Sequence, residues 1–394
     1  MSPDGNLAAF PPDPIAAVTH PDPYPYYMHL VAEAPLHRDV ASGLWVAAGA
    51  AAVTAALTSE LCRVRPPAEP VPRALLDTPA GEIFRHLVRM TDGRDRCPLK
   101  AAISTTLGAI AGPAVEVESR HWARHLAATI DPEGDPGAVT RFTFALPVHV
   151  VASRLGVPPD RLEETVQWTG DLVRCFAPAA RPGEIEQGAA AAGQLLELFR
   201  SLHAPGDTEA LLPSLVQEAD RLGRPDLPAI VANAVGFLSQ AYEATAGLVG
   251  NTLLALTRHR DLLDPAGGPR LRPGVVEEVQ RWDPPVQNTR RFLAGSGSVA
   301  GQEMGEGDAI LVVLAAANRD PAVNPAPERF DAARQNRRSF TFGFGAHACP
   351  GEVLATTIAR AGVEALLAAG VDPERLAGTV TYRPSANTRV PIFG

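Results

Sequence analysis

Cysteine is scarce in this chain, and the few cysteines present are far apart. Among 394 residues there are four, Cys62, Cys97, Cys175 and Cys349. Their positions show none of the paired spacings that hold a structural zinc ion or build a disulfide framework. The scarcity excludes a disulfide-rich secreted domain and fits a reducing compartment.

Positive charge is also in short supply. The chain has 35 lysines and arginines against 44 aspartates and glutamates, which gives a net charge of −9. A general nucleic-acid binder needs a basic face for phosphate contacts, so this class is excluded. Residues 1–10 have neither a basic nor an apolar leader segment, and no run of about twenty apolar residues follows. We therefore expect a soluble, cytoplasmic monomer without nucleic-acid or membrane partners.

Apolar residues make up 46% of the chain, and prolines and glycines punctuate loops without reaching the level typical of disorder. The first hundred residues are loop-rich, with short strand-like runs such as 43–48, and a terminal hairpin is expected near 382–387. Helical periodicity dominates from about residue 119. It predicts helices over 119–130, 140–155, 159–176, 184–203, 208–222, 228–258 and 274–282. The fold class expected is mainly α with a small β portion, in one domain over 1–394.

One short run carries the strongest chemical signal. Residues 342–351 read FGFGAHACPG, which places Cys349 on a glycine-punctuated loop before a helical pattern. A helix beginning at Cys349 and Pro350 would direct free amides and a positive dipole end at the sulfur, lowering the thiol pKa and favouring a metal-binding thiolate. Glycines permit tight turns and close approach to a flat ligand such as a porphyrin. The competing interpretation is a small buried hydrophobe beside a turn.

The pattern FGxGxHxCxG, matched at every fixed position, resembles that of the cytochrome P-450 family of haem-thiolate monooxygenases. The resemblance covers nearly the whole chain and implies the fold of that family. It implies haem b as cofactor, with Cys349 as the axial ligand of the iron, and a thiolate that favours O–O bond cleavage. It also implies that Phe342, Gly343, His347 and Gly351 contact the haem, His347 through a propionate.

Three further cations fall on positions that hold propionates in the family. Arg96 and Lys100 are four residues apart where the family has a His and an Arg, and both remain cationic. Arg291 falls on the family's other propionate-binding arginine. Two solvated basic residues would be the plainer interpretation of Arg96 and Lys100.

Glu278 and Arg281 are spaced so that their side chains share a helix face and can pair. A surface ion pair would explain that spacing equally well. The resemblance implies instead a buried structural network of Glu278, Arg281 and Arg334, with bidentate guanidinium contacts.

In the long helix over 228–258, small residues recur with helical spacing, and Glu243 adjoins them in an apolar stretch. A charge there is either solvated or functional. The resemblance assigns Glu243 to proton relay and shows a departure at the next residue. Ala244 occupies the place of the family's alcohol, and Thr245 comes one residue late, rotated by about 100°.

Several explanations of this departure compete. A substrate hydroxyl or an ordered water replaces the missing group, and hydroxylation or epoxidation is intact. Alternatively the oxidation is atypical, such as aryl coupling, desaturation or nitrogen-centred chemistry. A haem sensor or carrier without turnover is a third possibility, and use of hydrogen peroxide as the oxidant is a fourth. Glu243 argues against the last two.

The resemblance also implies a polar substrate pocket and external electron carriers. Its lining is expected to include Gly236, Ser239, Gln240, Gln287, Asn288, Thr289, Ala386 and Asn387. Buried amides reject ligands that leave them unpaired, so we expect a small secondary metabolite with hydrogen-bonding groups. Electrons would come from a ferredoxin and its reductase. The basic run over 334–338, beside the thiolate loop, could dock an acidic carrier through Arg337 and Arg338, although a solvated loop is as good an interpretation.

Overall fold

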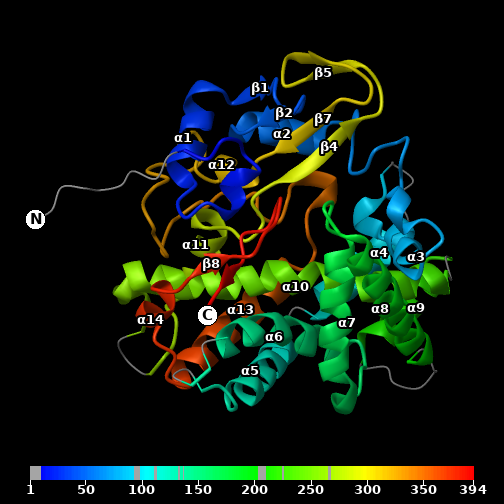
Figure 1. Ribbon diagram of the computed structural model, residues 1–394, viewed down its shortest axis with the longest axis vertical. Helices are drawn as coiled ribbons and strands as arrows, with labels where there is room; N and C mark the ends of the chain where they lie inside the picture. Colours follow the sequence, from blue (N-terminus) through cyan, green and yellow to red (C-terminus); the bar gives the residue numbers. More distant parts are fainter. Residues whose placement is uncertain are drawn as a thin grey trace, which may run out of the picture.

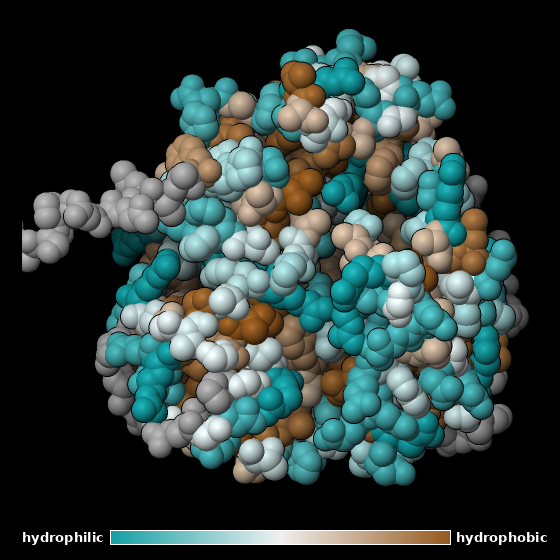
Figure 2. All heavy atoms as spheres, in the orientation of Figure 1, coloured by the Kyte–Doolittle hydropathy of each residue, from teal (hydrophilic) through white to brown (hydrophobic). Residues whose placement is uncertain are grey.

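A long central helix divides the molecule into a part that carries the main sheet and a part built of helices (Figure 1). The computed structural model describes residues 10–92, 98–110, 113–131, 134–135, 137–202, 210–223, 226–264 and 268–394. Hydrophilic residues cover most of the face in Figure 2, which leaves the apolar helix faces to the interior. No described helix is long and apolar enough to span a membrane.

Helices dominate the fold, as the sequence predicts. Their bounds are α1 Tyr24–Glu33, α2 Ala50–Thr58, α3 Pro79–His86, α4 Pro98–Ile110, α5 Pro113–Ala127, α6 Ala138–Arg154, α7 Leu162–Cys175, α8 Pro182–Ser201, α9 Leu211–Arg221, α10 Leu227–Arg258, α11 Val275–Trp282, α12 Leu314–Ala317, α13 Glu352–Ala368 and α14 Pro373–Ala377. The 3-10 helices used below are η3 Val88–Met90 and η6 Gly345–His347.

The β portion is small. A five-stranded sheet has the order β1-β2-β7-β4-β3, and β5-β6 and β8-β9 form two separate pairs. The strand bounds are β1 Leu36–Arg38, β2 Trp45–Ala47, β3 Cys62–Arg63, β4 Thr289–Leu293, β5 Gly297–Val299, β6 Gln302–Met304, β7 Ala309–Val312, β8 Thr381–Tyr382 and β9 Pro391–Ile392. In this sheet β2 pairs with β7 in parallel, with Trp45 opposite Ile310. The sheet thus joins segments from both ends of the chain.

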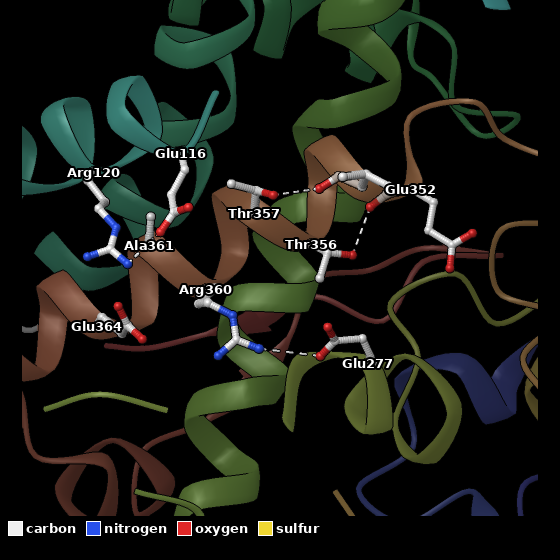
Figure 3. A pocket seen from close by; sticks show the side chains of 10 residues that line it. Glu116, Arg120, Glu277, Glu352, Thr356, Thr357, Arg360, Ala361 and Glu364 are labelled. Atoms are coloured by element: carbon white, nitrogen blue, oxygen red, sulfur yellow. Dashed lines mark hydrogen bonds and ion pairs between the residues drawn. The ribbon is translucent and has the colours of Figure 1, made fainter. Parts of the chain in front are cut away.

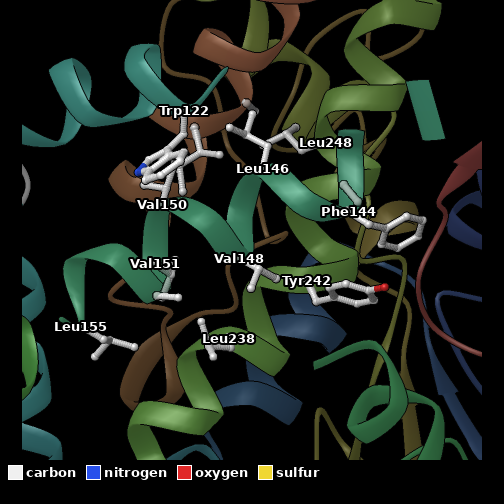
Figure 4. Packing of buried hydrophobic residues seen from close by; sticks show 14 of the residues in the cluster. Trp122, Phe144, Leu146, Val148, Val150, Val151, Leu155, Leu238, Tyr242 and Leu248 are labelled. Carbon is white, nitrogen blue, oxygen red and sulfur yellow. The ribbon is translucent and has the colours of Figure 1, made fainter. Parts of the chain in front are cut away.

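Helix α10 is the longest element, with 32 residues, or about 48 Å at 1.5 Å per residue. Its start follows the usual rules, because Asp226 caps the amide of Ala229 at 3.1 Å and Pro228 lies in the first turn. Apolar side chains on α10 pack against α6, as Figure 4 shows, and the rings of Phe144 and Tyr242 lie 4.8 Å apart. This packing fixes the helix that carries Glu243.

The structure corrects three expectations about secondary structure. The first hundred residues contain α1, α2 and α3 and are less loop-rich than expected. The helix after the cysteine begins at Glu352, three residues after Cys349, with Gly351 as its N-cap. The terminal hairpin is wider than 382–387, because β8 and β9 lie on either side of that segment and Tyr382 pairs with Pro391.

The carboxylate of Glu278 is fully buried among three guanidinium groups. Its oxygens lie 2.6 Å from Arg281 Nη2, 3.2 Å from Arg334 Nε and 2.8 Å from Arg337 Nε, and one accepts the Asp331 amide at 3.0 Å. Burial acts to raise the pKa of Glu278, but the hydrogen bonds and charges of the arginines lower it overall. The structure thus brings together the three residues expected from the sequence and adds Arg337.

Replacing Glu278 with Gln should be strongly destabilising, because it leaves buried guanidinium groups without their counter-charge. We expect the free energy of unfolding, measured with urea, to fall by about 3–5 kcal/mol. The matched control is Glu277→Gln on the same helix. Glu277 is partly exposed and meets Arg360 at 3.4 Å, so its loss should change stability by less than about 1 kcal/mol.

The same pair of variants tests the protonation state of Glu278. A carboxyl whose folded-state pKa is lowered contributes stability that is fully present above its ordinary pKa of 4.5 and is lost as the pH falls through the lowered value. The stability difference between wild type and Glu278→Gln should therefore shrink in acid. A difference that stays constant down to acid unfolding would contradict an ionised Glu278.

Candidate functional site

Backbone hydrogen bonds fold the cysteine loop into a fixed shape. The Cys349 amide donates to Phe342 O at 2.8 Å, and the Gly343 amide donates to Phe340 O at 2.8 Å. Gly343 and Gly345 have φ angles of 72° and 67°, a region that favours glycine. A Cβ on Gly343 would also lie only 3.2 Å from His347 O. Two of the glycines singled out in the sequence are therefore required by the turn itself, whereas Gly351 has a negative φ.

The Cys349 thiol is exposed and receives one amide, because Gly351 N–H points at the sulfur with N and Sγ 3.4 Å apart. Burial by the surrounding protein nonetheless raises the thiol pKa, and Glu352 raises it further, against the opposing effect of the Gly351 amide. The amide at the helix end thus acts in the expected direction, but burial outweighs it and the thiol pKa of the protein alone is raised. A metal ion deprotonates a coordinating thiol outright, so the sulfur is suited to a cation.

Arg291 on β4 is a buried cation without a carboxylate partner. Its side chain is 6% exposed, and its Nη1 donates to Arg290 O at 2.9 Å. Burial lowers its pKa, which Cys62 and Asp92 partly offset. None of the acids in the described part of the chain forms an ion pair with it. A buried guanidinium in this state fits a carboxylate supplied by a cofactor, such as a haem propionate.

The other expected propionate contacts have different outcomes. The Lys100 ammonium donates to Ala346 O in the cysteine loop, so this lysine reaches the site. His347 Nε2 lies 3.2 Å from Asp92 Oδ1, a partner that the sequence did not indicate. Asp92 also accepts the Val64 amide at 3.0 Å. Arg96 lies outside the described residues.

These features together fit a haem. The thiol stands on a glycine loop that lets a flat ligand approach, and Arg291 offers a buried positive charge. Phe342 and Gly343 belong to the same turn and are half-buried. Their contacts with the haem remain predictions.

Glu243 on α10 is held by two side chains from the C-terminal segment. Its Oε1 lies 3.0 Å from Arg383 Nε, and its Oε2 accepts a hydrogen bond from Thr388 Oγ1 at 3.0 Å. Arg383 also lies over the ring of Phe144, 5.3 Å from its centroid. The acid is therefore neither free nor simply solvated. We call these two contacts of Glu243, with Arg383 and Thr388, the clasp. The sequence offered no local signal for it, because Arg383 and Thr388 are far along the chain from Glu243.

The two residues after Glu243 differ in where they face. Ala244 is half-buried, whereas Thr245 is 1% exposed and belongs to the packed side of α10. The rotation between successive helix residues produces this difference. The threonine hydroxyl is thus turned into the protein, in line with the departure noted in the sequence.

Two of the residues expected to line a polar pocket, Gln287 and Asn288, are buried and hydrogen-bonded within the protein. Gln287 and Asn288 are 0% and 2% exposed, and their amides donate to Pro284 O at 2.6 Å and Ala386 O at 2.8 Å. The Asn288 amide thus reaches the C-terminal segment, whereas the Gln287 amide bonds to the turn after α11 and its Oε1 has no partner among the described residues. A role of either residue in lining the pocket stays a prediction. Thr289 opens β4 and lies opposite Val312.

The remaining lining candidates lie near the clasp or on α10. Ala386 is half-buried and Asn387 is exposed. The backbone amide of Gln287 donates a hydrogen bond to Asn387 O at 2.8 Å. On α10, Gly236 O accepts hydrogen bonds from Gln240 Nε2 at 2.7 Å and Ser239 Oγ at 3.1 Å. Gln240 is exposed, so its amide can turn to a ligand only by leaving this bond.

A separate groove of about 430 Å³ lies between α5, α11 and α13 (Figure 3). Acids dominate its lining, and its two arginines are paired, Arg120 with Glu116 at 2.7 Å and Arg360 with Glu277 at 3.4 Å. It contains none of the residues expected at the active site. The groove therefore does not compete with the cysteine loop as the candidate site.

Comparisons with known proteins identify a family model and relatives that resemble this chain. The family model for cytochrome P-450 matches residues 271–369, which include Glu278 and Cys349. The 6-deoxyerythronolide B hydroxylase of Saccharopolyspora erythraea is 31% identical over 63% of this chain and 64% of its own length. The vitamin D(3) 25-hydroxylase of Pseudonocardia autotrophica is 34% identical over 62% of this chain and 60% of its own length. The matches span 56–64% of the length of these and two further curated relatives.

Solved structures give the same answer over more of the chain. The crystal structure of CalO2 superposes with a TM-score of 0.72 at 26% identity and covers 94% of both chains. RauA, solved with a biosynthetic intermediate of aurachin RE, superposes with a TM-score of 0.77 at 21% identity, over 97% of this chain and 96% of its own. The match of fold, cysteine loop and sequence over these lengths shows that the chain belongs to the cytochrome P-450 family.

Proposed function

We propose that the protein is a haem-thiolate monooxygenase that oxidises a small secondary metabolite. The observation that carries the proposal is the Cys349 thiol on its rigid glycine loop, together with the unpaired buried cation of Arg291. The overall reaction is insertion of one oxygen atom: substrate C–H, O2, two electrons and two protons give substrate C–OH and water. Epoxidation has the same balance, with oxygen added across a C=C bond.

The protein would hold haem b through Cys349 on the iron and through Arg291 and Lys100 on the propionates, with Arg96 as a further expected contact. Bound haem would supply the oxygen chemistry, and a thiolate ligand favours O–O cleavage. The glycine loop keeps the sulfur in place, and the cations would orient the porphyrin edge. Because Arg291 is buried, its bond to a propionate would be shielded from water and from salt.

Glu243 would deliver the protons. In the structure it is held by Arg383 and Thr388, so it can pass a proton only when one of these contacts loosens or when Thr388 hands the proton on. A positioned acid of this kind contributes typically 10²–10⁴-fold to a rate. A haem sensor without turnover needs no such acid, which favours an enzyme.

No hydroxyl stands at Ala244, and the Thr245 hydroxyl is turned inward. We infer that a hydroxyl of the substrate or an ordered water completes the proton path. The alternative is an atypical oxidation, such as aryl coupling, desaturation or nitrogen-centred chemistry, in which this path matters less. The polar Gln240 among small residues of α10 supports that alternative.

Relatives support the substrate class. The names of 6-deoxyerythronolide B hydroxylase and vitamin D(3) 25-hydroxylase denote hydroxylation of small molecules, and PikC of Streptomyces venezuelae is named a monooxygenase. We extend this class to the present chain, with a soluble and cytoplasmic enzyme as the setting.

Electrons would come from a ferredoxin and its reductase. The basic run over 334–338 is a weaker docking site than its charge suggests, because Arg334 and Arg337 are both committed to Glu278. Arg338 is the cation of this run left for docking, and it lies over the ring of Phe344 at 4.3 Å. A test of docking therefore changes Arg338, since a change at Arg337 would damage the ion network.

The decisive experiment supplies the haem-loaded protein with NADPH, a ferredoxin and its reductase, and a library of small metabolites under labelled O2. We expect one labelled oxygen atom in a product whose formation requires all three electron components. A dehydrogenated or coupled product without label would support the atypical alternative. Ligand-induced spectral changes without any product would indicate a sensor.

Replacing Arg291 with Gln should weaken haem retention, because a buried charged bond to a propionate is lost. We expect at least a tenfold faster transfer of haem to apomyoglobin, since such bonds are worth about 1.5–3 kcal/mol. The control is Arg290→Gln, on the same strand but only half-buried. Equal haem loss from the two variants would contradict the role of Arg291.

Replacing Glu243 with Gln should lower turnover about 100-fold while substrate binding stays within a factor of two or three. Thr245→Val is the matched control, because its hydroxyl is turned into the protein, and its turnover should stay near that of the wild type. Turnover is measured as product formed per enzyme per unit time. A Thr245→Val variant as impaired as Glu243→Gln would show that Thr245 takes part in the relay.

A further inference from the structure

A short segment after α3 crosses from α10 to the cysteine loop. At its start, the Val88 amide donates to Asn233 Oδ1 on α10 at 2.9 Å, and Asn233 Nδ2 donates to His86 O at 2.8 Å. At its end, Asp92 meets His347 of the cysteine loop at 3.2 Å. The five residues 88–92 thus span the gap between the helix that carries Glu243 and the loop that carries Cys349. The space beside them is where the fold would hold a haem and its substrate.

Arg89 lies at the α10 end of this crossing. Leu87, two residues before Arg89, packs so closely on α10 that a Cβ on Gly236 would lie 2.6 Å from Leu87 Cδ2. Gly236 is one helical turn before Gln240, on the approach to Glu243. Arg89 is therefore nearer to the substrate side of the gap than to the propionate side, where Asp92 and His347 meet.

Two properties of Arg89, on this segment between α10 and the cysteine loop, indicate that its guanidinium faces the space between them. The residue is exposed, yet desolvation by the surrounding protein lowers its pKa. A side chain on the outer surface would be exposed without being desolvated. Both conditions hold together for a side chain that faces an interior space open to solvent. Cys349 shows the same combination on the other side of this space.

The Arg89 guanidinium has no carboxylate partner among the described residues. Among the described residues, none forms a hydrogen bond or ion pair with the Arg89 side chain. Glu243, the acid of the nearby α10 face, is already occupied by Arg383 and Thr388. Asp92, at the other end of the crossing, is bound to His347 and to the Val64 amide. A desolvated guanidinium without an anion favours a ligand that brings one, and its fork geometry matches a carboxylate.

We propose that Arg89 binds a carboxylate of the substrate and so selects anionic substrates over neutral ones. The proposal rests on the proposed function, since it assigns the substrate class of the same site. It also refines the sequence-based expectation of a merely hydrogen-bonding substrate. The sequence held a signal for this role, because Arg89 is a lone charge in the apolar run Leu87-Val88-Arg89-Met90.

The test compares binding of matched acids and alcohols to the haem-loaded protein. Aliphatic and aromatic pairs are used, dodecanoate with dodecan-1-ol and 4-phenylbutyrate with 4-phenylbutan-1-ol, and dissociation constants are measured by equilibrium dialysis. For the wild type we expect each acid to bind at least about tenfold more tightly than its alcohol. Arg89→Gln should abolish this preference, and Arg89→Lys should keep part of it. Arg85→Gln, an exposed position in the last turn of α3, is the control and should keep all of it.

Two results would overturn the proposal. One is an acid preference that is absent in the wild type or unchanged in Arg89→Gln. The other is rapid haem loss from Arg89→Gln, which would assign the guanidinium to a porphyrin carboxylate instead. A protein that prefers acids through Arg89 but never forms product would refute only the monooxygenase function. A protein that oxidises neutral metabolites and ignores acids would refute only the role of Arg89.

Discussion

The buried carboxylate of Glu278 is the contact on which the cysteine loop depends. It gathers Arg281, Arg334 and Arg337 and so ties the segment after residue 331 to α11. The same segment is held further along, where Phe340 N–H donates to Asn318 Oδ1 at 2.6 Å. The loop follows directly, closed by the Cys349 amide on Phe342 O. The ion network and these hydrogen bonds together hold the segment that carries the thiol, so breaking the network should affect both stability and the site.

The opposite side of the site depends on the C-terminal segment. Arg389 anchors it, with Nε 3.0 Å from Asp283 and further bonds to the carbonyls of Val18, His20 and Pro21. This anchor holds Thr388, and with it the clasp on Glu243. Because the same segment also contains Ala386 and Asn387, a substrate that shifts it would change the contacts of the acid. If Glu243 and this segment have the roles proposed above, substrate position and proton supply would therefore be mechanically linked.

The sequence predicted the parts of the fold and site that are encoded locally. The cysteine loop, the long helix over 228–258 and the pairing of Glu278 with Arg281 follow from spacing within a few residues. Contacts between distant segments left no such pattern: Thr388 and Glu243 are 145 residues apart, and Asp92 and His347 are 255 apart. The bond from the Asn288 amide to Ala386 O likewise joins distant segments, whereas the bond from the Gln287 amide to Pro284 O is local.

The central claim is that the sulfur of Cys349 is the axial ligand of a haem iron. The most direct test is the absorption spectrum of the reduced, haem-loaded protein under carbon monoxide, compared with Cys349→Ser and with Cys62→Ser as the control at a buried cysteine outside the loop. A thiolate ligand predicts a strongly red-shifted Soret band in the wild type and in Cys62→Ser, and its loss in Cys349→Ser. A wild-type band at the position typical of an imidazole ligand, or an unchanged band in Cys349→Ser, would contradict the account.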